Sequence, residues 1–506
     1  MKLFYKNGFH DKLDMIKRLP ILLAAIGVIL RIIPVWAMPT WYDENFTILV
    51  ARLPIPQLIQ ATAGDVHPPL WYLLVWPLVR IPGLPGWMAI RLPAVVFGIL
   101  TLWVWWEILK VLVSKKWFHC WFENGPRWHF IKDLRRVSLI AFGLFCILPQ
   151  QIYYSQEGRM YSLLTLLVLL AWYFILTRRW VWLAVASAAM LWLHNYGLIY
   201  LAVLWAATLV YDRRTWKPLT IALSAAGLSF IPWVFVLTRQ MGDISGNYWI
   251  THFSLPSVLG DLAHSVFGTM VLAPDMLNIV VFYGIVTWVL IWSLRRRTLN
   301  LPAVILAFLP WLVSIGISRL WQPIMLYRAL IPSSAFLCLI LAEPFEYLGR
   351  RPQMLLALFA IPALTVSLLA ILLRARWAAD FVELDGESAR IVDAHWQPGD
   401  LLYYVDDGVY VSGAVYWKNI NNALQEPQCG PVRGGLTDQT QNALGMKSGP
   451  LPPNYPGRIW VISGMTPLMG TCFDDYLKDN GLMDTVPLYC SQNNSLVRSC
   501  LYLVRR

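Results

Sequence analysis

Charge is scarce in this chain. Only 14% of its 506 residues are Asp, Glu, Lys or Arg, whereas soluble globular domains carry about 25%. Hydrophobic residues make up 58% of the chain, which also contains 27 Trp. Several apolar segments are roughly 17–25 residues long, which is enough for a helix to cross a bilayer. The composition therefore argues against an ordinary soluble protein and predicts a polytopic membrane protein.

Several familiar signals are also missing. No small-residue cleavage site follows the first apolar run, "ILLAAIGVILRIIPVWAMP", so we interpret it as a retained first span rather than a signal peptide. The strand-like "DLLYYVDD" weakly resembles strands of nucleotide-type folds, but no Gly-rich phosphate motif follows it, so we draw no function from that likeness. The cysteines of the C-terminal region include no CxxC pair, which makes zinc binding less favoured than disulfide formation.

Positive charge is concentrated outside the C-terminal region. Residues 378–506 hold 14 acidic and 9 basic residues, whereas the remainder holds 15 acidic and 32 basic residues. Basic loops of a membrane protein are typically cytoplasmic. The net charge of +12 therefore predicts a membrane orientation, and we predict no nucleic-acid partner.

Eleven apolar segments predict membrane spans. They are 19–38, 90–112, 137–152, 160–177, 180–194, 196–211, 217–237, 275–294, 300–318, 326–343 and 354–373. The apolar run within 70–86 has only about 12 residues, which favours an interfacial or re-entrant helix. Counting it as non-crossing places the basic loop 114–136 inside, whereas the outer segment 240–274 has no Lys or Arg. We predict a multi-pass protein of the plasma (inner) membrane with its N-terminus in the cytoplasm.

The C-terminal region differs from the rest. We predict a membrane domain over residues 1–377 and a small extracytoplasmic α/β domain over 378–506. "DLLYYVDDGVYVSGAVYW" and "RIWVISG" are typical of strands, and "TCFDDYLKDNGL" of a short helix. This region holds Cys429, Cys472, Cys490 and Cys500, which allow one or two disulfides whose pairing the sequence does not define.

The first outer loop carries four ionisable groups beside the membrane. Asp43 and Glu44 follow the first span, and Asp65 and His67 follow about 22 residues later in "DVHPPL", where two prolines stiffen the backbone. Ionised groups at a membrane boundary are costly and mark functional candidates. The alternatives are solvated loop carboxylates and a structural histidine.

A second outer segment, "YYSQEGRMYSLL", opens the predicted span 160–177. It places Gln156, Glu157, Arg159 and Tyr161 together. We predict that Glu157 joins Asp43 near the reacting atoms and that Arg159 binds phosphate, because the planar guanidinium group matches phosphate oxygens bidentately. The alternatives are a Glu157–Arg159 ion pair and an arginine that extends to the interface.

Further candidates lie at other outer helix ends. They are His194, Tyr327, Arg328 and, with weaker support, Arg91. Outer arginines run against the positive-inside bias, which suggests a compensating anion. Carboxylates and arginines on one outer face favour a reaction on a lipid-linked phosphate. A carboxylate would remove a proton from an acceptor hydroxyl, and cations would stabilise the phosphate that leaves.

The motifs "WYDEN", "DVHPPLWYLL", "RLPAVVFGIL" and "YSQEGRMYSLLTLL" together resemble the GT-C membrane glycosyltransferases. The resemblance runs from about residue 19 to residue 340 and is strongest to the bacterial family 39 type, related to protein O-mannosyltransferases and the aminoarabinose transferase of lipid A. It implies an inverting transfer of a hexose or pentose from a polyprenyl-phosphate-linked donor to a lipid, glycan or protein acceptor.

The resemblance also implies residue roles. The family's acidic residue after the first span acts as base or metal ligand and matches Asp43, with Glu44 beside it. The second acidic residue matches Glu157, so a divalent metal ion is expected, if at all, on Asp43 and Glu157. His67 and Arg159 match donor-binding positions, and Arg328 is a looser match to a late outer arginine. Tyr161, together with Gln156, Tyr327 and Arg91, completes the predicted set.

Two alternatives belong to other functional classes. A transporter or flippase of lipid-linked sugars is expected to show repeated halves with polar residues at mid-membrane depth, whereas this chain gathers its polar residues on one face. An assembly protein that displays the C-terminal domain does not need Asp43, His67, Glu157 and Arg159. The sequence defines neither the sugar nor the acceptor.

Overall fold

The computed structural model separates the chain into two compact units. It describes residues 18–33, 40–114, 134–247, 254–267, 275–296, 300–346, 361, 365, 368–369, 387–404, 407–417, 423–425, 436–449, 455–463, 488–490 and 500–504. Met1–Trp36, Arg91–Ile231 and Ile250–Leu372 form what we call the helical unit. Ala37–Ile90, Pro232–Trp249 and Leu373–Arg506 form what we call the mixed unit.

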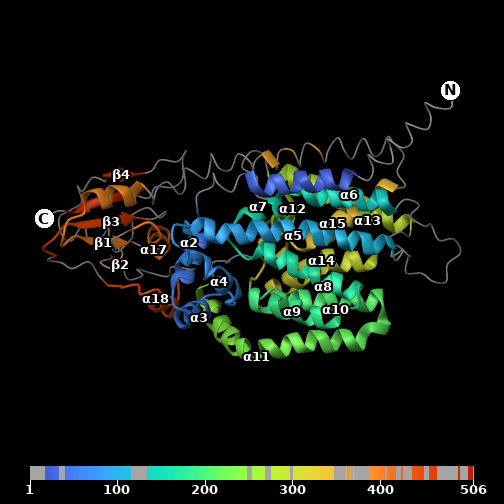
Figure 1. Cartoon of the computed structure of the whole chain (residues 1–506), viewed down its shortest axis with the longest axis horizontal. Helices are drawn as coiled ribbons and strands as arrows, with labels where there is room; N and C mark the ends of the chain where they lie inside the picture. The colour runs from blue at the N-terminus through green and yellow to red at the C-terminus, as the bar shows by residue number, and fades with distance from the viewer. Residues whose placement is uncertain are drawn as a thin grey trace, which may run out of the picture. The chain divides into compact units, whose positions relative to one another are not determined.

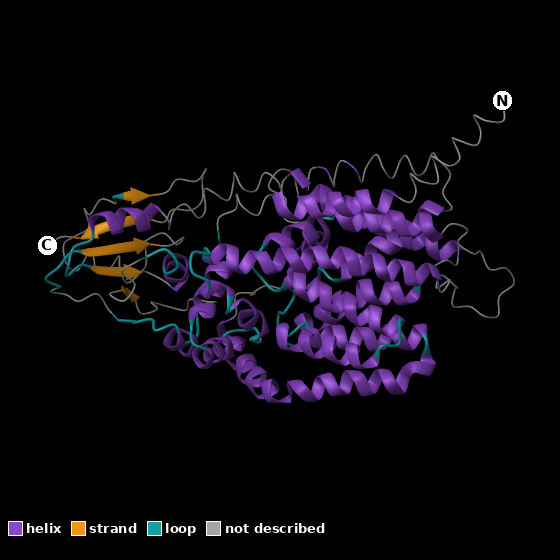
Figure 2. Ribbon diagram, in the orientation of Figure 1, coloured by secondary structure: helices purple, strands orange, loops and turns teal. Residues whose placement is uncertain are grey.

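The helical unit consists of apolar helices that run side by side (Figures 1 and 2). A helix covers 18–32. It is followed by α5 (Gly86–Ser114, from residue 91 on), α6 (Leu134–Ile147), α7 (Pro149–Gln156), α8 (Tyr161–Leu176), α9 (Trp180–Leu193), α10 (Gly197–Tyr211), η3 (Arg213–Thr215), α11 (Trp216–Asn247, up to residue 231), α12 (Leu255–Phe267), α13 (Asp275–Arg296), α14 (Leu301–Leu320), η4 (Tyr327–Leu330), α15 (Ser333–Ala342) and η5 (Glu343–Glu346). Helices therefore cover ten of the eleven predicted spans, and the eleventh, 354–373, falls almost entirely outside the described residues.

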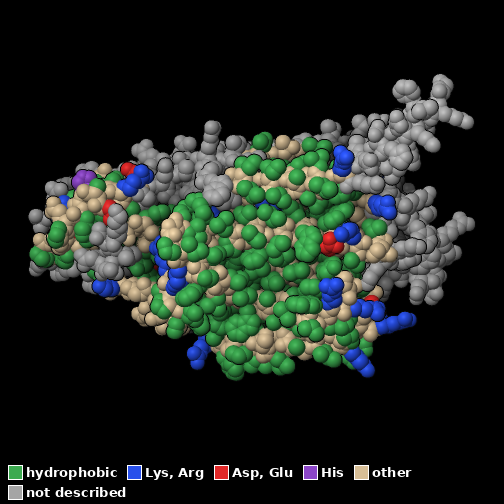
Figure 3. All heavy atoms as spheres, viewed as in Figure 1, with side chains coloured by type: hydrophobic (Ala, Val, Ile, Leu, Met, Phe, Trp, Pro, Cys, Tyr) green, Lys and Arg blue, Asp and Glu red, His purple; other side chains and the backbone are tan. Residues whose placement is uncertain are grey.

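Length and composition identify the helices that can cross a membrane. Within the described ranges, three are long and apolar enough: Gly86–Ser114, Arg213–Gly242 and Leu301–Leu320. The bent pair Arg135–Ile147 and Pro149–Gln156, with a 46° angle, makes a fourth if it is one span. Hydrophobic side chains cover most of the visible face of these helices (Figure 3). The chain is a multi-pass membrane protein, and the count of eleven crossings stays a prediction.

The mixed unit begins with the short helices of the first outer loop. These are α2 (Tyr42–Arg52), α3 (Ile55–Gly64), α4 (Leu70–Val75) and η2 (Leu78–Arg80). The six-residue α4 rises only about 9 Å, far less than the thickness of a bilayer, which agrees with the prediction of a non-crossing segment. The Arg80 guanidinium donates to the carbonyls of Ala51, Arg52 and Leu53, so η2 is fixed against the end of α2.

The rest of the mixed unit is a small α/β structure built on a five-stranded sheet. Its strands are β1 (Leu401–Tyr404), β2 (Ala423–Gln425), β3 (Ile459–Ser463), β4 (Tyr489–Cys490) and β5 (Cys500–Val504), in the order β2-β1-β3-β5-β4. β1 pairs in parallel with β2 and β3, whereas β5 runs antiparallel to β3 and β4. The predicted strands at β1 and β3 are confirmed.

One predicted strand is wrong. "DGVYVSG" forms helix α17 (Asp407–Gly413) instead. Val409, Tyr410 and Val411 are all buried, whereas a strand with one covered face would expose the middle residue of the three. A further short helix, α18 (Asp438–Ala443), begins at Thr437, whose hydroxyl accepts from the Thr440 N–H.

The cysteines are only partly described. Cys490 and Cys500 are register partners on β4 and β5, and such partners lie about 4.5–5.5 Å apart between Cα atoms, within the range of disulfides. Cys429, Cys472 and the predicted helix "TCFDDYLKDNGL" lie outside the described residues. The disulfide pairing stays a prediction.

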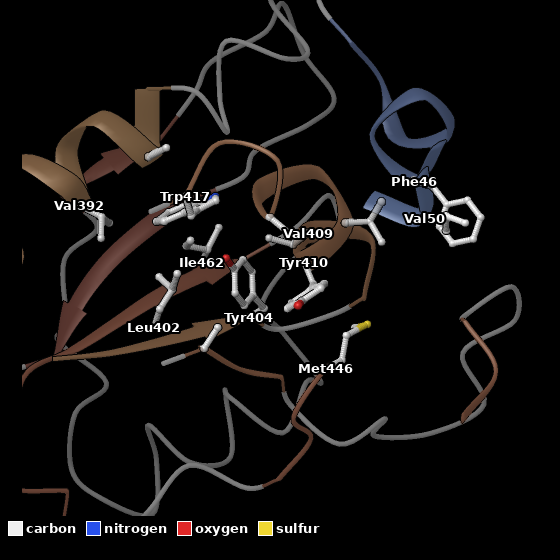
Figure 4. Close-up of a cluster of buried hydrophobic side chains, with 14 of the residues drawn as sticks. Phe46, Val50, Val392, Leu402, Tyr404, Val409, Tyr410, Trp417, Met446 and Ile462 are labelled. Atoms are coloured by element: carbon white, nitrogen blue, oxygen red, sulfur yellow. The ribbon is translucent and has the colours of Figure 1, made fainter. Parts of the chain in front are cut away.

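The core of the mixed unit joins the C-terminal region to the first outer loop. Phe46 and Val50 of α2 belong to the same buried cluster as Tyr404 of β1 and Val409 and Tyr410 of α17 (Figure 4). Leu58 and Ala61 of α3 and Ala443 and Met446 near α18 belong to it as well. The loop helices therefore pack in one core with the predicted C-terminal domain, although the sequence analysis assigned them to the membrane domain.

Candidate active site

The string "YYSQEGRMY" forms a tight turn between α7 and α8. α7 ends at Gln156, and the Arg159 N–H donates to the Glu157 carbonyl at 2.7 Å, so the chain reverses over two residues. Glu157 and Arg159 are only 2% and 3% exposed, and Tyr161 is fully buried at the start of α8. Burying charged groups is costly, and such positions in a membrane protein mark functional sites.

Tyr161 lies at the centre of the predicted residues of the helical unit. The Tyr154 ring lies 5.1 Å from it and the His194 ring 5.8 Å, measured between centroids. The Arg328 guanidinium carbon lies 5.7 Å from the Tyr161 ring centroid, within the range of a cation–π contact. The structure thus brings together groups from α7, α8, η4 and the junction after α9.

His194 is a neutral member of this cluster. Its Nδ1 accepts the Tyr196 N–H at 3.1 Å, which places the proton of the neutral ring on Nε2. His194 directly follows the end of α9, is 3% exposed and interacts electrostatically with Arg159 and Arg328. It is therefore a buried, neutral group with two cations nearby.

Tyrosines of α10 and its N-cap hold the segment that carries Arg328. The Tyr196 hydroxyl donates to the Ile324 carbonyl at 2.7 Å, and the Tyr200 hydroxyl donates to the Ala329 carbonyl at 3.0 Å. These two bonds fix the backbone on either side of Arg328. The backbone that carries Arg328 is therefore restrained by hydrogen bonds from α10 and its N-cap.

Helix α12 adds two groups that the sequence analysis missed. His264 lies with its ring 6.0 Å from that of Tyr327, and the Gln150 side chain of α7 donates to the His264 carbonyl. Asp261 interacts electrostatically with Tyr327, and burial raises the pKa of Asp261 from 3.8 to about 6. The signal was available, because Asp261 lies in the predicted outer segment 240–274, which lacks Lys and Arg. Tyr154 was likewise inside the quoted motif.

The acidic pair of the first outer loop opens α2 in the mixed unit. Asp43 and Glu44 lie in its first turn, where the helix dipole favours negative charge. Asp43 is half-buried, whereas Glu44 is 1% exposed. The Thr47 hydroxyl donates to the Asp43 carbonyl at 2.8 Å. Both carboxylates are therefore carried by a short, ordered helix rather than by an irregular loop.

Asp65 and His67 follow directly on the end of α3 in the same unit. Asp65 is the C-cap of α3, and His67, before Pro68 and Pro69, is 8% exposed. The structure places Asp43, Glu44, Asp65 and His67 in the mixed unit. It places Arg91, Gln156, Glu157, Arg159, Tyr161, His194, Tyr327 and Arg328 in the helical unit.

Two further predicted residues, Arg91 and Gln156, are also buried. Arg91 is 1% exposed within α5, and Gln156 donates to the Leu30 carbonyl at 2.7 Å, which ties α7 to the first helix. Among the described residues, no three His, Cys, Asp or Glu side chains form a group able to hold a metal ion. The metal ion expected on Asp43 and Glu157 therefore stays a prediction.

The arrangement of the helices is that of the GT-C fold. The chain resembles the crystal structure of ArnT, an aminoarabinose transferase, from Cupriavidus metallidurans in the apo state, with a TM-score of 0.57 and 14% identity over 96% of this chain and 97% of that one. The same protein bound to undecaprenyl phosphate matches with a TM-score of 0.57 and 13% identity over the same shares. The fold implied by the sequence motifs is thus confirmed. No protein-family model and no curated protein sequence matches the chain.

Proposed function

We propose that this chain is a glycosyltransferase that moves a sugar from a polyprenyl-phosphate-linked donor to an acceptor hydroxyl at the outer face of the inner membrane. The carrying observation is the cluster around Tyr161, where Arg328 and Arg159 crowd a buried, neutral His194. Arginine side chains bind phosphate oxygens through charged hydrogen bonds, which makes a phosphate the ligand that best fits this cluster. The undecaprenyl phosphate bound by the ArnT of the same fold supports this choice of ligand.

The proposed reaction is a single displacement. The acceptor oxygen forms a bond to the anomeric carbon while the bond from that carbon to the phosphate oxygen breaks, so the configuration inverts. Asp43 takes the acceptor proton, and the polyprenyl phosphate leaves with its new charge stabilised by Arg159 and Arg328. In this proposal the neutral His194 ring donates a hydrogen bond from Nε2–H to the phosphate. The Tyr161 ring packs against Arg328.

The remaining residues keep the roles that the sequence suggested. Glu44 and Glu157 are the additional carboxylates, and His67 contacts the donor. A divalent metal ion on Asp43 and Glu157 would make transfer depend on added metal. Measuring transfer after chelation, and again after graded addition of Mg²⁺ or Mn²⁺, tests this. The acceptor is a lipid, glycan or protein, and the C-terminal region lies on the outer side.

The decisive test replaces Asp43. In proteoliposomes supplied with a polyprenyl-phosphate sugar, we expect Asp43→Asn to lower transfer about 10²–10⁴-fold, because a general base contributes that much. Glu107→Gln is the matched control, since Glu107 pairs only locally with Lys110 at 2.7 Å. Full activity of Asp43→Asn contradicts the assigned base. Movement of intact lipid-linked sugar across the bilayer, without release of polyprenyl phosphate, supports the transporter alternative instead.

A further inference from the structure

The C-terminal end of α3 is bonded in an unusual way. The last carbonyls of a helix lack partners within the helix. Here six successive carbonyls, from Gln60 to Asp65, accept hydrogen bonds from side chains distant in sequence. The donors are Gln439 to Gln60 at 3.0 Å, Thr440 to Ala61 at 3.1 Å, Thr437 to Gly64 at 2.8 Å, and the Gln240 amide to Thr62 at 3.1 Å, Ala63 at 3.3 Å and Asp65.

These donors come from two places in the mixed unit. Thr437, Gln439 and Thr440 belong to α18 and its N-cap, in the C-terminal region. Gln240 is 3% exposed near the end of α11, and its two amide hydrogens are shared among three carbonyls. The end of α3 is therefore held between the C-terminal region and α11.

The contact between the end of α3 and the threonines of α18 and its N-cap is close enough to favour a glycine at position 64. A Cβ atom on Gly64 would lie 2.6 Å from the Thr440 hydroxyl oxygen and 2.7 Å from that of Thr437. Real Cβ atoms essentially never approach other heavy atoms within 3.0 Å, so a methyl group here would displace the two hydroxyls. Gly64 thus lets the two threonines reach the backbone.

The last turn of α3, which is described in full, carries no basic residue, and its C-cap Asp65 is extended rather than left-handed. Pro68 and Pro69 follow within four residues and stiffen the chain beyond the helix. The bonds from α18 and α11 add to this restraint, because they hold the backbone carbonyls up to Asp65. The residues that follow the end of α3 are Asp65, Val66 and His67.

We propose that Thr437, Gln439 and Thr440 of the C-terminal region, together with Gln240 of α11, are positioning residues that hold the Asp65–His67 segment in its binding geometry. The inference rests on the proposed function for the role of His67 but not for the mechanical coupling. The C-terminal region accordingly supports donor binding through α3. Small displacements of the Asp65–His67 segment should lower the rate of transfer strongly.

The test uses the full chain in lipid nanodiscs and undecaprenyl phosphate as the binding probe. Thr437→Val with Thr440→Val removes both hydroxyls at nearly constant volume. We expect faster amide hydrogen exchange over residues 58–68, weaker binding of the probe by roughly tenfold, and a raised KM for the donor with a smaller change in kcat. Thr437→Ser with Thr440→Ser keeps both hydroxyls and should restore all three values.

Two matched pairs keep the result interpretable if the double variant does not fold. Gln439→Ala removes a bond to α3, whereas Gln441→Ala removes a bond to Leu436 within its own region, so only the first should alter exchange at the end of α3. Gly64→Ala should act like the double variant, whereas Gly242→Ala, with open space around its Cβ, should not.

Exchange and activity separate the two claims. Unchanged exchange over residues 58–68 in Gln439→Ala and Gly64→Ala overturns the positioning role, whatever the activity. If exchange rises but the wild-type chain transfers no sugar, the coupling holds and the proposed function fails. If exchange rises while probe binding and the donor KM stay unchanged, the segment is coupled but His67 does not serve the donor, which overturns the binding role.

Discussion

The two units bury charge in opposite ways. In the mixed unit, the Asp400 carboxylate accepts from the Gln397 N–H at 2.9 Å, Arg458 at 2.7 and 3.0 Å and Trp460 at 2.8 Å. Burial alone would raise the pKa of Asp400, but these donors outweigh it and lower the pKa. In the helical unit, Arg159 and Arg328 both interact electrostatically with the buried ring of His194.

This difference indicates which buried charges stabilise the fold and which serve ligand binding. A charge surrounded by opposite charge and hydrogen bonds stabilises the folded state. Two arginines beside one buried neutral ring are instead typical of a site that binds an anionic ligand, because the guanidinium group matches phosphate and carboxylate oxygens. We therefore read the Asp400–Arg458 pair as structural and the cluster around Tyr161 as a binding site.

Within this comparison, the largest effect on transfer and ligand binding is expected for Arg328, the arginine beside Tyr161. Arg328→Ala should reduce transfer and binding of undecaprenyl phosphate on the order of 100-fold, as expected for a lost charged hydrogen bond to a ligand, with little change in Tm. Arg458→Ala, the matched arginine of the structural pair, should lower the unfolding temperature of the mixed unit and leave binding unchanged. Binding assays and thermal scans of both variants check this. If Arg328→Ala lowers Tm without weakening binding, and Arg458→Ala weakens binding without lowering Tm, the roles assigned to the two arginines are wrong.

A smaller effect concerns Asp261. Because burial raises its pKa to about 6, the side chain is protonated at pH 5 and ionised at pH 7. If the ionised form serves the reaction, transfer in the wild type should rise several-fold across this interval, and Asp261→Asn should flatten that step. Folding stability should fall between about pH 4 and 6 and then level off, since the unfolded carboxyl ionises first. A step that persists in Asp261→Asn assigns it to another group.

The smallest effect on transfer is expected for Asp400→Asn. Its folded pKa is lowered, so its contribution to stability is present above the pKa of the unfolded chain and is lost as the pH falls through the folded value. At pH 7 the variant should unfold a few degrees lower, about 4 °C, with transfer unchanged. The wild type should lose this advantage on acidification, which thermal scans at pH 7 and pH 3 measure. An equal difference at both values contradicts the ion-pair role.

The sequence predicted the helices of the helical unit well, because their apolar runs are interrupted by charges and glycines at the segment ends. Arg178 and Arg179 separate α8 from α9, and His194 begins the junction before α10. It failed at α17, where Val409 and Tyr410 follow a strand and look like its continuation. Burial of both beside α2 decides that segment, and such long-range packing leaves no local signal.

In the candidate site, too, residues that are close in sequence were predictable and residues that meet through packing were not. Glu157, Arg159 and Tyr161 were identifiable because they share one short motif. The convergence of His194 and Arg328 on Tyr161 could not be predicted, because these residues follow Tyr161 by 33 and 167 residues and meet it only through packing. Gln240 carried no signal at all, since a glutamine in an apolar helix becomes meaningful only when its acceptors are known.

The end of α3 has a consequence for biosynthesis. Thr437 follows Gly64 by 373 residues, and a ribosome adds about 5–20 residues per second, so α3 leaves the ribosome roughly 20–75 s before its capping residues exist. During that interval the Asp65–His67 segment lacks the bonds from α18 that hold it. A chain that ends before residue 437 therefore releases the helices of the first outer loop without that cap, and completion of the C-terminal region becomes the step at which a nascent chain acquires its binding geometry.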